Sequence, residues 1–215
     1  MINKSKEEVN KILDILEEIY PEAQCELNYN NPFELLIATM LSAQTTDKKV
    51  NEVTKILFKK YPTPQEFLKA NKEELEQDIK VIGLYRNKSK NIINMCKVLV
   101  EQYNCQVPNN KEELMKLAGV GRKTANVVLS NAFNVPAIAV DTHVFRVSNR
   151  IGLANGDNVL KTEKQLQSVI PKERWSKAHH LIIFHGRRAC KARKPNCKEC
   201  ILKEYCNYYK ENIIQ

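Results

Sequence analysis

Four cysteines near the C-terminal end of the chain have the type and spacing of a metal site. Cys190, Cys197, Cys200 and Cys206 lie in the run CKARKPNCKECILKEYC, with gaps of six, two and five residues and no histidine between them. Ligand sets made only of thiolates hold either a tetrahedral zinc ion or an iron-sulfur cluster. The spacing favours a metal over unrelated free thiols, and it leaves zinc and iron-sulfur equally open.

The same cysteine loop is strongly basic, because Lys191, Arg193 and Lys194 occupy its first gap. Such a run of charge is usually a solvated surface, but a loop held by a metal could also present these side chains to phosphates. The whole chain carries a net charge of +9. This charge favours an anionic partner, and DNA or RNA comes first among the candidates.

A second motif, LAGVGRKTANVV, places two glycines between helical runs. Gly119 and Gly121 let the backbone turn sharply. Backbone N–H groups at the start of the following helix can then point at an anion, which the helix dipole also favours. We therefore expect Gly119, Val120, Gly121 and Arg122 to bind a DNA phosphate, although glycines also end helices for purely structural reasons.

Helices must position both motifs, because apolar residues recur at helical spacing along most of the chain. Val9, Ile12, Leu13 and Leu16 are one example. Prolines separate these runs, and no alternation of apolar and polar residues is long enough for a sheet. The 215 residues predict an all-α protein of about ten helices, large enough for one domain or two small ones.

No segment is suited to a membrane or to export. The longest apolar stretch, Phe33 to Leu41, is far shorter than the ~20 residues of a spanning helix. The N-terminal MINKSKEEVNKILDILEEIY predicts an amphipathic helix rather than a signal peptide. We expect an intracellular protein, cytoplasmic or associated with the nucleoid, in which Cys25, Cys96 and Cys105 are buried small hydrophobic residues.

Four motifs, in order between Phe33 and Cys206, resemble those of the endonuclease III family of helix-hairpin-helix DNA glycosylases. They are LLIATMLSAQTTD, IGLYRNKSKNI, LAGVGRKTAN with the following IAVDTHVFRVSNR, and the four-cysteine loop. The resemblance implies two helical lobes with DNA in a cleft. Residues 25–135 would form a helical bundle with the hairpin, and residues 1–24 with 136–215 would carry the cluster. It also implies a 4Fe-4S cluster held by the four cysteines, with zinc as the runner-up. We expect the protein to be a monomer.

The family activity is that of a bifunctional DNA glycosylase and AP lyase, and the resemblance implies oxidised pyrimidines in double-stranded DNA as its substrates. Lys123 matches the family's catalytic lysine. It follows Arg122 near a helix start, where positive charge and the helix dipole favour a neutral, nucleophilic amine. Such an amine could displace the base, form a Schiff base with the opened sugar and allow β-elimination. The alternative is an ordinary phosphate-contacting lysine.

Asp141 has both a structural and a catalytic interpretation. In AVDTH it is placed to cap a helix that begins at Thr142. The family match favours catalysis, in which the carboxylate stabilises positive charge on the sugar and handles protons for Lys123. His143 could contact DNA or this aspartate, or it could be structural. The other three histidines, at 179, 180 and 185, are expected to be structural.

Extruding a nucleotide leaves a gap in the duplex, which the enzyme must fill. Gln44 in SAQTTD and Leu84 in IGLYR match positions that the family inserts into the DNA stack, as an amide for the orphaned base and as an apolar wedge. The residues alone would instead indicate a helix-surface amide and a core leucine. Asp47 is a further match, and it would support the pocket or a catalytic water.

Two other functions compete with this one. Adenine-mismatch glycosylases share the hairpin and the cluster, but they typically lack a lysine at position 123 and carry a further C-terminal domain. A non-catalytic iron-sulfur module would only grip DNA, and it leaves the pairing of Lys123 with Asp141 unexplained. The chain departs from some relatives at Met115, where they carry an acid.

Overall fold

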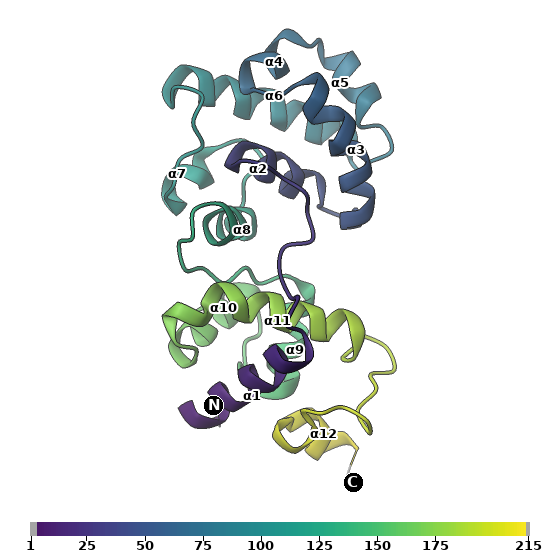
Figure 1. The fold of residues 1–215 in the computed structure, drawn as a ribbon, viewed down its shortest axis with the longest axis vertical. Helices are drawn as coiled ribbons and strands as arrows, with labels where there is room; N and C mark the ends of the chain where they lie inside the picture. Colours follow the sequence, from purple (N-terminus) through teal and green to yellow (C-terminus); the bar gives the residue numbers. More distant parts are fainter. Residues whose placement is uncertain (1–3, 214–215) are drawn as a thin grey trace. The chain divides into compact units, whose positions relative to one another are not determined.

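The computed structural model describes residues 4–213, and within them every regular element is a helix (Figure 1). The all-α prediction is confirmed. The described residues contain twelve α-helices and two short 3₁₀ helices, more than expected. The additional helices include α4 (Pro64–Lys69), α7 (Lys111–Lys116) and α12 (Asn207–Asn212), which have six residues each and are too short to show a helical period.

The chain divides into two compact units, which are described separately. Unit 1 contains Met1–Cys25 and Val135–Gln215, and unit 2 contains Glu26–Asn134. The helices of unit 1 are α1 (Lys6–Ile19), α9 (Thr142–Ile151), α10 (Val159–Val169), η1 (Lys172–Arg174), α11 (Trp175–Arg188), η2 (Lys203–Tyr205) and α12. The helices of unit 2 are α2 (Pro32–Leu41), α3 (Asp47–Lys60), α4, α5 (Lys72–Asp78), α6 (Tyr85–Gln102), α7 and α8 (Arg122–Ala132).

Helix α2 is the core helix of unit 2, because nearly all of its sequence, PFELLIATML, is apolar. Leu35, Leu36 and Ile37 are completely buried, and the helix packs against α3, α6 and α8. Burying each such side chain stabilises the fold by about 1.5–3 kcal/mol. The longest apolar run of the sequence is therefore a core helix. Among residues 4–213, no helix has the length and apolar character needed to cross a membrane.

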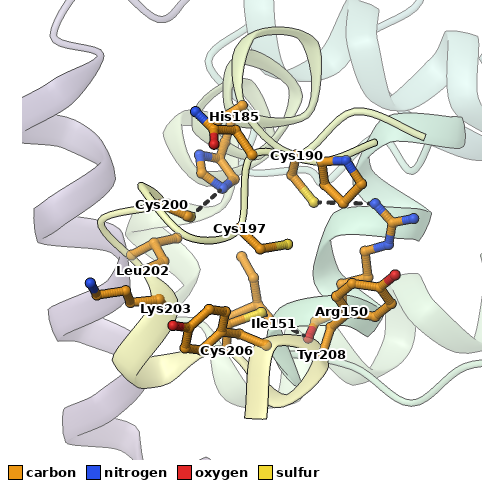
Figure 2. Close-up of a pocket in the computed structure, with 14 residues that line it drawn as sticks. Arg150, Ile151, His185, Cys190, Cys197, Cys200, Leu202, Lys203, Cys206 and Tyr208 are labelled. Atoms are coloured by element: carbon orange, nitrogen blue, oxygen red, sulfur yellow. Dashed lines mark hydrogen bonds between the residues drawn. The ribbon is translucent and has the colours of Figure 1, made fainter. Parts of the chain in front are cut away.

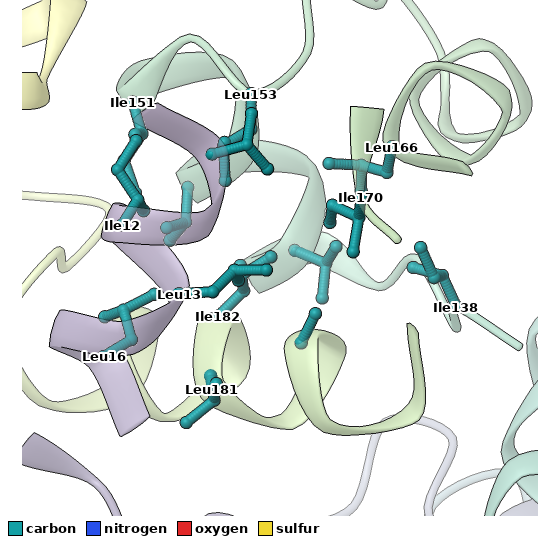
Figure 3. Close-up of a cluster of buried hydrophobic side chains, with 14 of the residues drawn as sticks. Ile12, Leu13, Leu16, Ile138, Ile151, Leu153, Leu166, Ile170, Leu181 and Ile182 are labelled. Carbon is teal, nitrogen blue, oxygen red and sulfur yellow. The ribbon is translucent and has the colours of Figure 1, made fainter. Parts of the chain in front are cut away.

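The core of unit 1 joins helices that are distant in the sequence (Figure 3). The expected amphipathic N-terminal helix is α1, which starts at a reciprocal capping box and buries Ile12 and Leu16. These side chains belong to one cluster with Ile151 of α9, Leu166 of α10 and Ile182 of α11. This cluster fixes α9, the helix that begins beside Asp141, on the body of the unit.

Only one of the three scattered cysteines is buried as expected. Cys96 is completely buried on α6, whereas Cys25 and Cys105 are half-buried. Cys25 lies in the non-helical segment after α1, and Cys105 lies in a turn after α6 with φ of 63°. The expectation was wrong for these two because neither lies on the apolar face of a helix.

Candidate active site and cysteine centre

The glycine motif forms a tight turn between α7 and α8. Gly119 has φ of +77°, and a Cβ there would lie 2.9 Å from side-chain atoms of Asn91 and Met40, so both the backbone and the packing require glycine. Val120 is buried, and its N–H donates to the Leu117 carbonyl at 3.1 Å. Gly121 differs, because its φ is −90° and a Cβ there would meet no atom within 4 Å. Its missing side chain leaves open space before α8.

Lys123 is the second residue of α8, and its side chain is exposed. The N-cap of this helix is Gly121, which has no side chain to accept a hydrogen bond from the first N–H groups. The first turn of α8 contains no acidic residue. These N–H groups and the positive end of the helix dipole are suited to a phosphate, and the Lys123 amine lies at the same end of the helix.

Asp141 is the N-cap of α9, as the structural interpretation expected. Its Oδ1 accepts hydrogen bonds from the backbone N–H groups of His143 and Val144, both at 2.8 Å. The other carboxylate oxygen takes part in neither bond, and the residue is half-buried. The cap therefore holds the carboxylate in a fixed orientation and leaves its second oxygen outside both of these bonds.

His143 is held against α11. Its Nδ1 lies 3.2 Å from Nη2 of Arg146, and a Cβ on Gly186 would be only 3.1 Å from the His143 ring and Cβ. Arg146 also donates to the carbonyl oxygens of Gly186 at 3.1 Å and Cys190 at 3.0 Å. These contacts give His143 a structural role, and they connect the first turn of α9 to the first cysteine.

Gln44 and Leu84 lie at the tips of two turns in unit 2. Gln44 follows α2 with φ of 58°, and Leu84 precedes α6 with φ of 60°; both are exposed. A Cβ on Gly83 would lie 3.5 Å from the Gln44 carbonyl oxygen, so the two turns are neighbours. Neither a helix-surface amide nor a core leucine describes these positions. Asp47, the first residue of α3, is half-buried.

The four cysteines of the loop line one cavity (Figure 2). The nearby side chains of Arg150 and His185 each reach a sulfur: Arg150 Nη1 lies 3.6 Å from Cys190 Sγ, and His185 Nε2 lies 3.6 Å from Cys200 Sγ. As they stand, no three His, Cys, Asp or Glu side chains within residues 4–213 form a site for a single metal ion. The zinc alternative receives no support from this geometry.

The cavity disfavours the charged, thiolate form of its cysteines unless a cation is present. Burial raises the pKa of Cys197, Cys200 and Cys206, and neighbouring cysteines act in the same direction. A cationic metal centre removes this penalty, because thiolates are its ligands. Four thiols around one cavity are therefore a donor set that fits an iron-sulfur cluster.

The basic side chains of the loop point to solvent while its backbone is held by α9. Lys191, Arg193 and Lys194 are all exposed. Arg150 of α9 donates to the Lys191 carbonyl at 2.8 Å and to the Ala192 carbonyl at 3.0 Å. The loop thus presents three cations from a backbone that is fixed at two points.

Two protein-family models match the chain. The model described as "HhH-GPD superfamily base excision DNA repair protein" matches residues 37–172, and the model described as "Iron-sulfur binding domain of endonuclease III" matches residues 190–206. The first covers more than half of the chain, and the second spans all four clustered cysteines. Fold and site therefore define a base excision DNA repair protein with an iron-sulfur cluster.

Individual relatives narrow this class to one family. Endonuclease III of Bacillus subtilis (strain 168) is 56% identical over 195 residues, covering 90% of this chain and 89% of the relative. Endonuclease III of Escherichia coli (strain K12) is 49% identical over 212 residues, covering 99% of each chain. The chain belongs to the endonuclease III family.

Solved structures agree with this assignment. A trapped endonuclease III–DNA covalent intermediate is 55% identical, with a TM-score of 0.92 over 97% of this chain and 98% of that one. A non-covalent endonuclease III–DNA complex is 54% identical, with a TM-score of 0.93 over 99% of this chain and 100% of that one. The expected class is confirmed: the chain is a DNA glycosylase and AP lyase of base excision repair.

The sequence did not point to three residues that organise these sites. Arg146 and Arg150 are one helical turn apart on α9, and both reach the cysteine loop. Lys88 is a buried lysine of α6. Lys88 stands in a charged helical segment, YRNKSK, which normally indicates a solvated face. For the arginines, their i,i+4 spacing on one face was the available signal.

Proposed function

We propose that the chain acts as a monomer on double-stranded DNA, removes oxidised pyrimidines and cleaves the resulting abasic strand through Lys123. The observation that carries this proposal is an exposed primary amine in the first turn of α8, directly after a hairpin with open space at Gly121. A phosphate bound there would bring the sugar of the same strand to the amine. The related endonuclease III solved as a covalent intermediate with DNA supports this assignment.

The reaction begins when the Lys123 amine forms a bond to the anomeric carbon. The bond from that carbon to the base breaks, and the base leaves with the bonding electrons and takes up a proton. Opening of the sugar ring gives a Schiff base. Loss of a proton from the 2′ carbon then breaks the bond to the 3′ oxygen, which cleaves the strand, and water finally releases the lysine.

Asp141 supplies the carboxylate for this chemistry. Because its Oδ1 is fixed by two backbone N–H groups, the negative charge is held in place before the reaction begins. A preorganised carboxylate stabilises the positive charge that develops on the sugar as the base departs. We assign it also the removal of the proton that the attacking amine must lose.

We propose a 4Fe-4S cluster, with Cys190, Cys197, Cys200 and Cys206 each binding one iron. When bound, such a cluster would crosslink the loop, and its irons would offset the negative charge of the four thiolates. Base removal and β-elimination transfer no net electrons, so the loop residues serve in binding. Lys191, Arg193 and Lys194 would contact phosphates, while Gln44 and Leu84 would fill the gap left by the extruded nucleotide.

Release of free bases from defined duplexes tests the substrate class. One duplex carries an oxidised thymine opposite adenine, a second carries adenine opposite guanine, and a third is undamaged. We expect the oxidised thymine to be released and the normal bases to stay in place. Release of adenine from the second duplex, with the oxidised thymine left intact, would instead support a mismatch-specific adenine glycosylase.

A further inference from the structure

Lys88 is a lysine whose charge lies inside unit 2. It is the fourth residue of α6 and is 6% exposed. Its ammonium donates to the carbonyl oxygens of Leu41 at 2.8 Å and Ala43 at 2.6 Å. Burial lowers the pKa of Lys88. A lysine is rarely kept in such a place without a specific partner, and here the partners are two carbonyls of one turn.

The two carbonyls belong to the turn that carries Gln44. Leu41 is the last residue of α2, where carbonyl groups have no partner within the helix, and Ala43 directly precedes Gln44. The positive charge of Lys88 also suits the negative end of the α2 dipole. The turn is closed by a further bond, from the Thr45 N–H to the Ser42 carbonyl at 3.1 Å. The ammonium therefore fixes this turn from the inside.

The backbone of Lys88 holds the other tip. Its N–H donates to the Leu84 carbonyl at 3.0 Å, and the same carbonyl accepts a hydrogen bond of 3.1 Å from the Asn87 N–H. Leu84 and Gln44 both have left-handed backbones, which non-glycine residues adopt only where their surroundings impose them. One residue thus binds one tip by its side chain and the other by its backbone.

We propose that Lys88 is a positioning residue that clamps the Gln44 and Leu84 turns into one rigid wedge, so that both tips are in place before a nucleotide is extruded. This inference rests on the proposed roles of Gln44 and Leu84 in filling the gap in the duplex. If the two turns are already ordered before DNA binds, less binding free energy is lost in ordering them. Loss of the Lys88 contacts should therefore lower the rate on duplex substrates, in which a gap has to be filled.

The test compares Lys88→Met with the native chain, using the cluster-containing protein. Methionine has a similar length but cannot donate to the two carbonyls. Lys97→Met is the matched control, because Lys97 lies on the same helix and is exposed. We expect Lys88→Met to slow excision of oxidised thymine from a duplex by about tenfold or more, since two buried carbonyls lose a charged donor. Strand cleavage on single-stranded abasic DNA should stay within about twofold, because no gap forms there.

A second readout follows the wedge directly. The fluorescence of 2-aminopurine opposite an uncleavable abasic analogue should rise when the native chain inserts its tips, and rise less with Lys88→Met. An equal loss on duplex and single-stranded substrates would mean a general structural role, and no loss on either would also overturn the proposal. If Lys88→Met does not fold, Lys88→Gln, whose shorter amide can donate hydrogen bonds but carries no charge, should show the same duplex-specific loss in weaker form.

The wedge variants separate this proposal from the function on which it rests. One outcome is that Gln44→Ala and Leu84→Ala selectively lose excision on duplexes while Lys88→Met does not. In that case the positioning role of Lys88 is wrong, and the gap-filling roles of Gln44 and Leu84 are retained. If neither tip variant shows a duplex-specific loss, the gap-filling roles of Gln44 and Leu84 are wrong, and so is the positioning role of Lys88 that depends on them. An absence of strand cleavage by the native chain on both substrates would refute the proposed lyase chemistry instead.

Discussion

The Arg150 guanidinium donates a hydrogen bond of 2.8 Å to the carbonyl oxygen of Lys191. Arg150 lies in the last turn of α9, the helix that is capped by Asp141, and Lys191 follows the first clustered cysteine. Arg150 also stacks on the Tyr208 ring, with 4.7 Å between the guanidinium carbon and the ring centroid. The basic loop and Asp141 are thus attached to the same helix.

Arg150→Gln should loosen the cysteine loop. Glutamine lacks the planar guanidinium that bonds two carbonyls, and each lost charge-assisted hydrogen bond costs about 1.5–3 kcal/mol when buried and less at this half-buried site. We expect faster loss of the cluster's visible absorbance in the presence of an iron chelator, and weaker duplex binding. Arg193→Gln is the control, because its exposed side chain should affect DNA binding alone. Equal cluster lifetimes in all three proteins would contradict this role.

The two hairpin glycines should respond differently to alanine. Gly119→Ala forces a Cβ against Asn91 and Met40 at a left-handed position, so we expect a loss of about 1–3 kcal/mol in the free energy of unfolding. Gly121→Ala meets no protein atom and should leave unfolding nearly unchanged, while the added methyl group blocks close approach of a phosphate. Urea unfolding and duplex affinity would check both. If Gly121→Ala binds DNA with unchanged affinity, no phosphate contacts the protein at Gly121.

Asp141→Asn separates capping from catalysis. Asparagine is as good an N-cap as aspartate, so we expect the free energy of unfolding to change by less than about 0.5 kcal/mol. Base excision should fall by about 100-fold or more, because the charge that stabilises the sugar and accepts the proton is gone. Asp141→Ala, which loses the cap as well, should in addition be destabilised by about 1 kcal/mol. Excision at the native rate by the folded asparagine variant would show that Asp141 only caps α9.

Stability should fall in mild acid because of His180. Burial, with a smaller contribution from Lys177, lowers the pKa of His180 to about 4, against 6.5 for an unburied histidine. In the unfolded chain His180 is therefore protonated near pH 6.5, whereas in the folded chain it is protonated only near pH 4. The free energy of unfolding therefore decreases as the pH falls from about 6.5 to about 4. The loss is at most about 3 kcal/mol. Denaturant unfolding between pH 7 and pH 4 should show a shallower decline for His180→Gln than for the native chain.

The sequence predicted the parts of the molecule that depend on local pattern. Apolar spacing predicted helix α1 and the all-α class, and residue spacing predicted the cysteine centre and the hairpin. Contacts between distant segments could not be predicted in this way. No local pattern distinguishes Lys88 or Arg150 from solvated charges. Only the fold shows that Lys88 is buried over a turn 45 residues earlier and that Arg150 reaches a loop 41 residues later. The exposed, left-handed positions of Gln44 and Leu84 are likewise products of packing.

Trapping of a Schiff base with borohydride tests the central assignment most directly. The native chain, Lys123→Ala and Lys123→Arg are incubated with duplexes that carry an abasic site or an oxidised thymine. Arginine keeps the positive charge for phosphate contact but cannot form the imine. We expect a covalent adduct on both duplexes for the native chain and none for either variant, with DNA still bound by Lys123→Arg. Adducts of native yield in Lys123→Arg would show that another amine is the nucleophile.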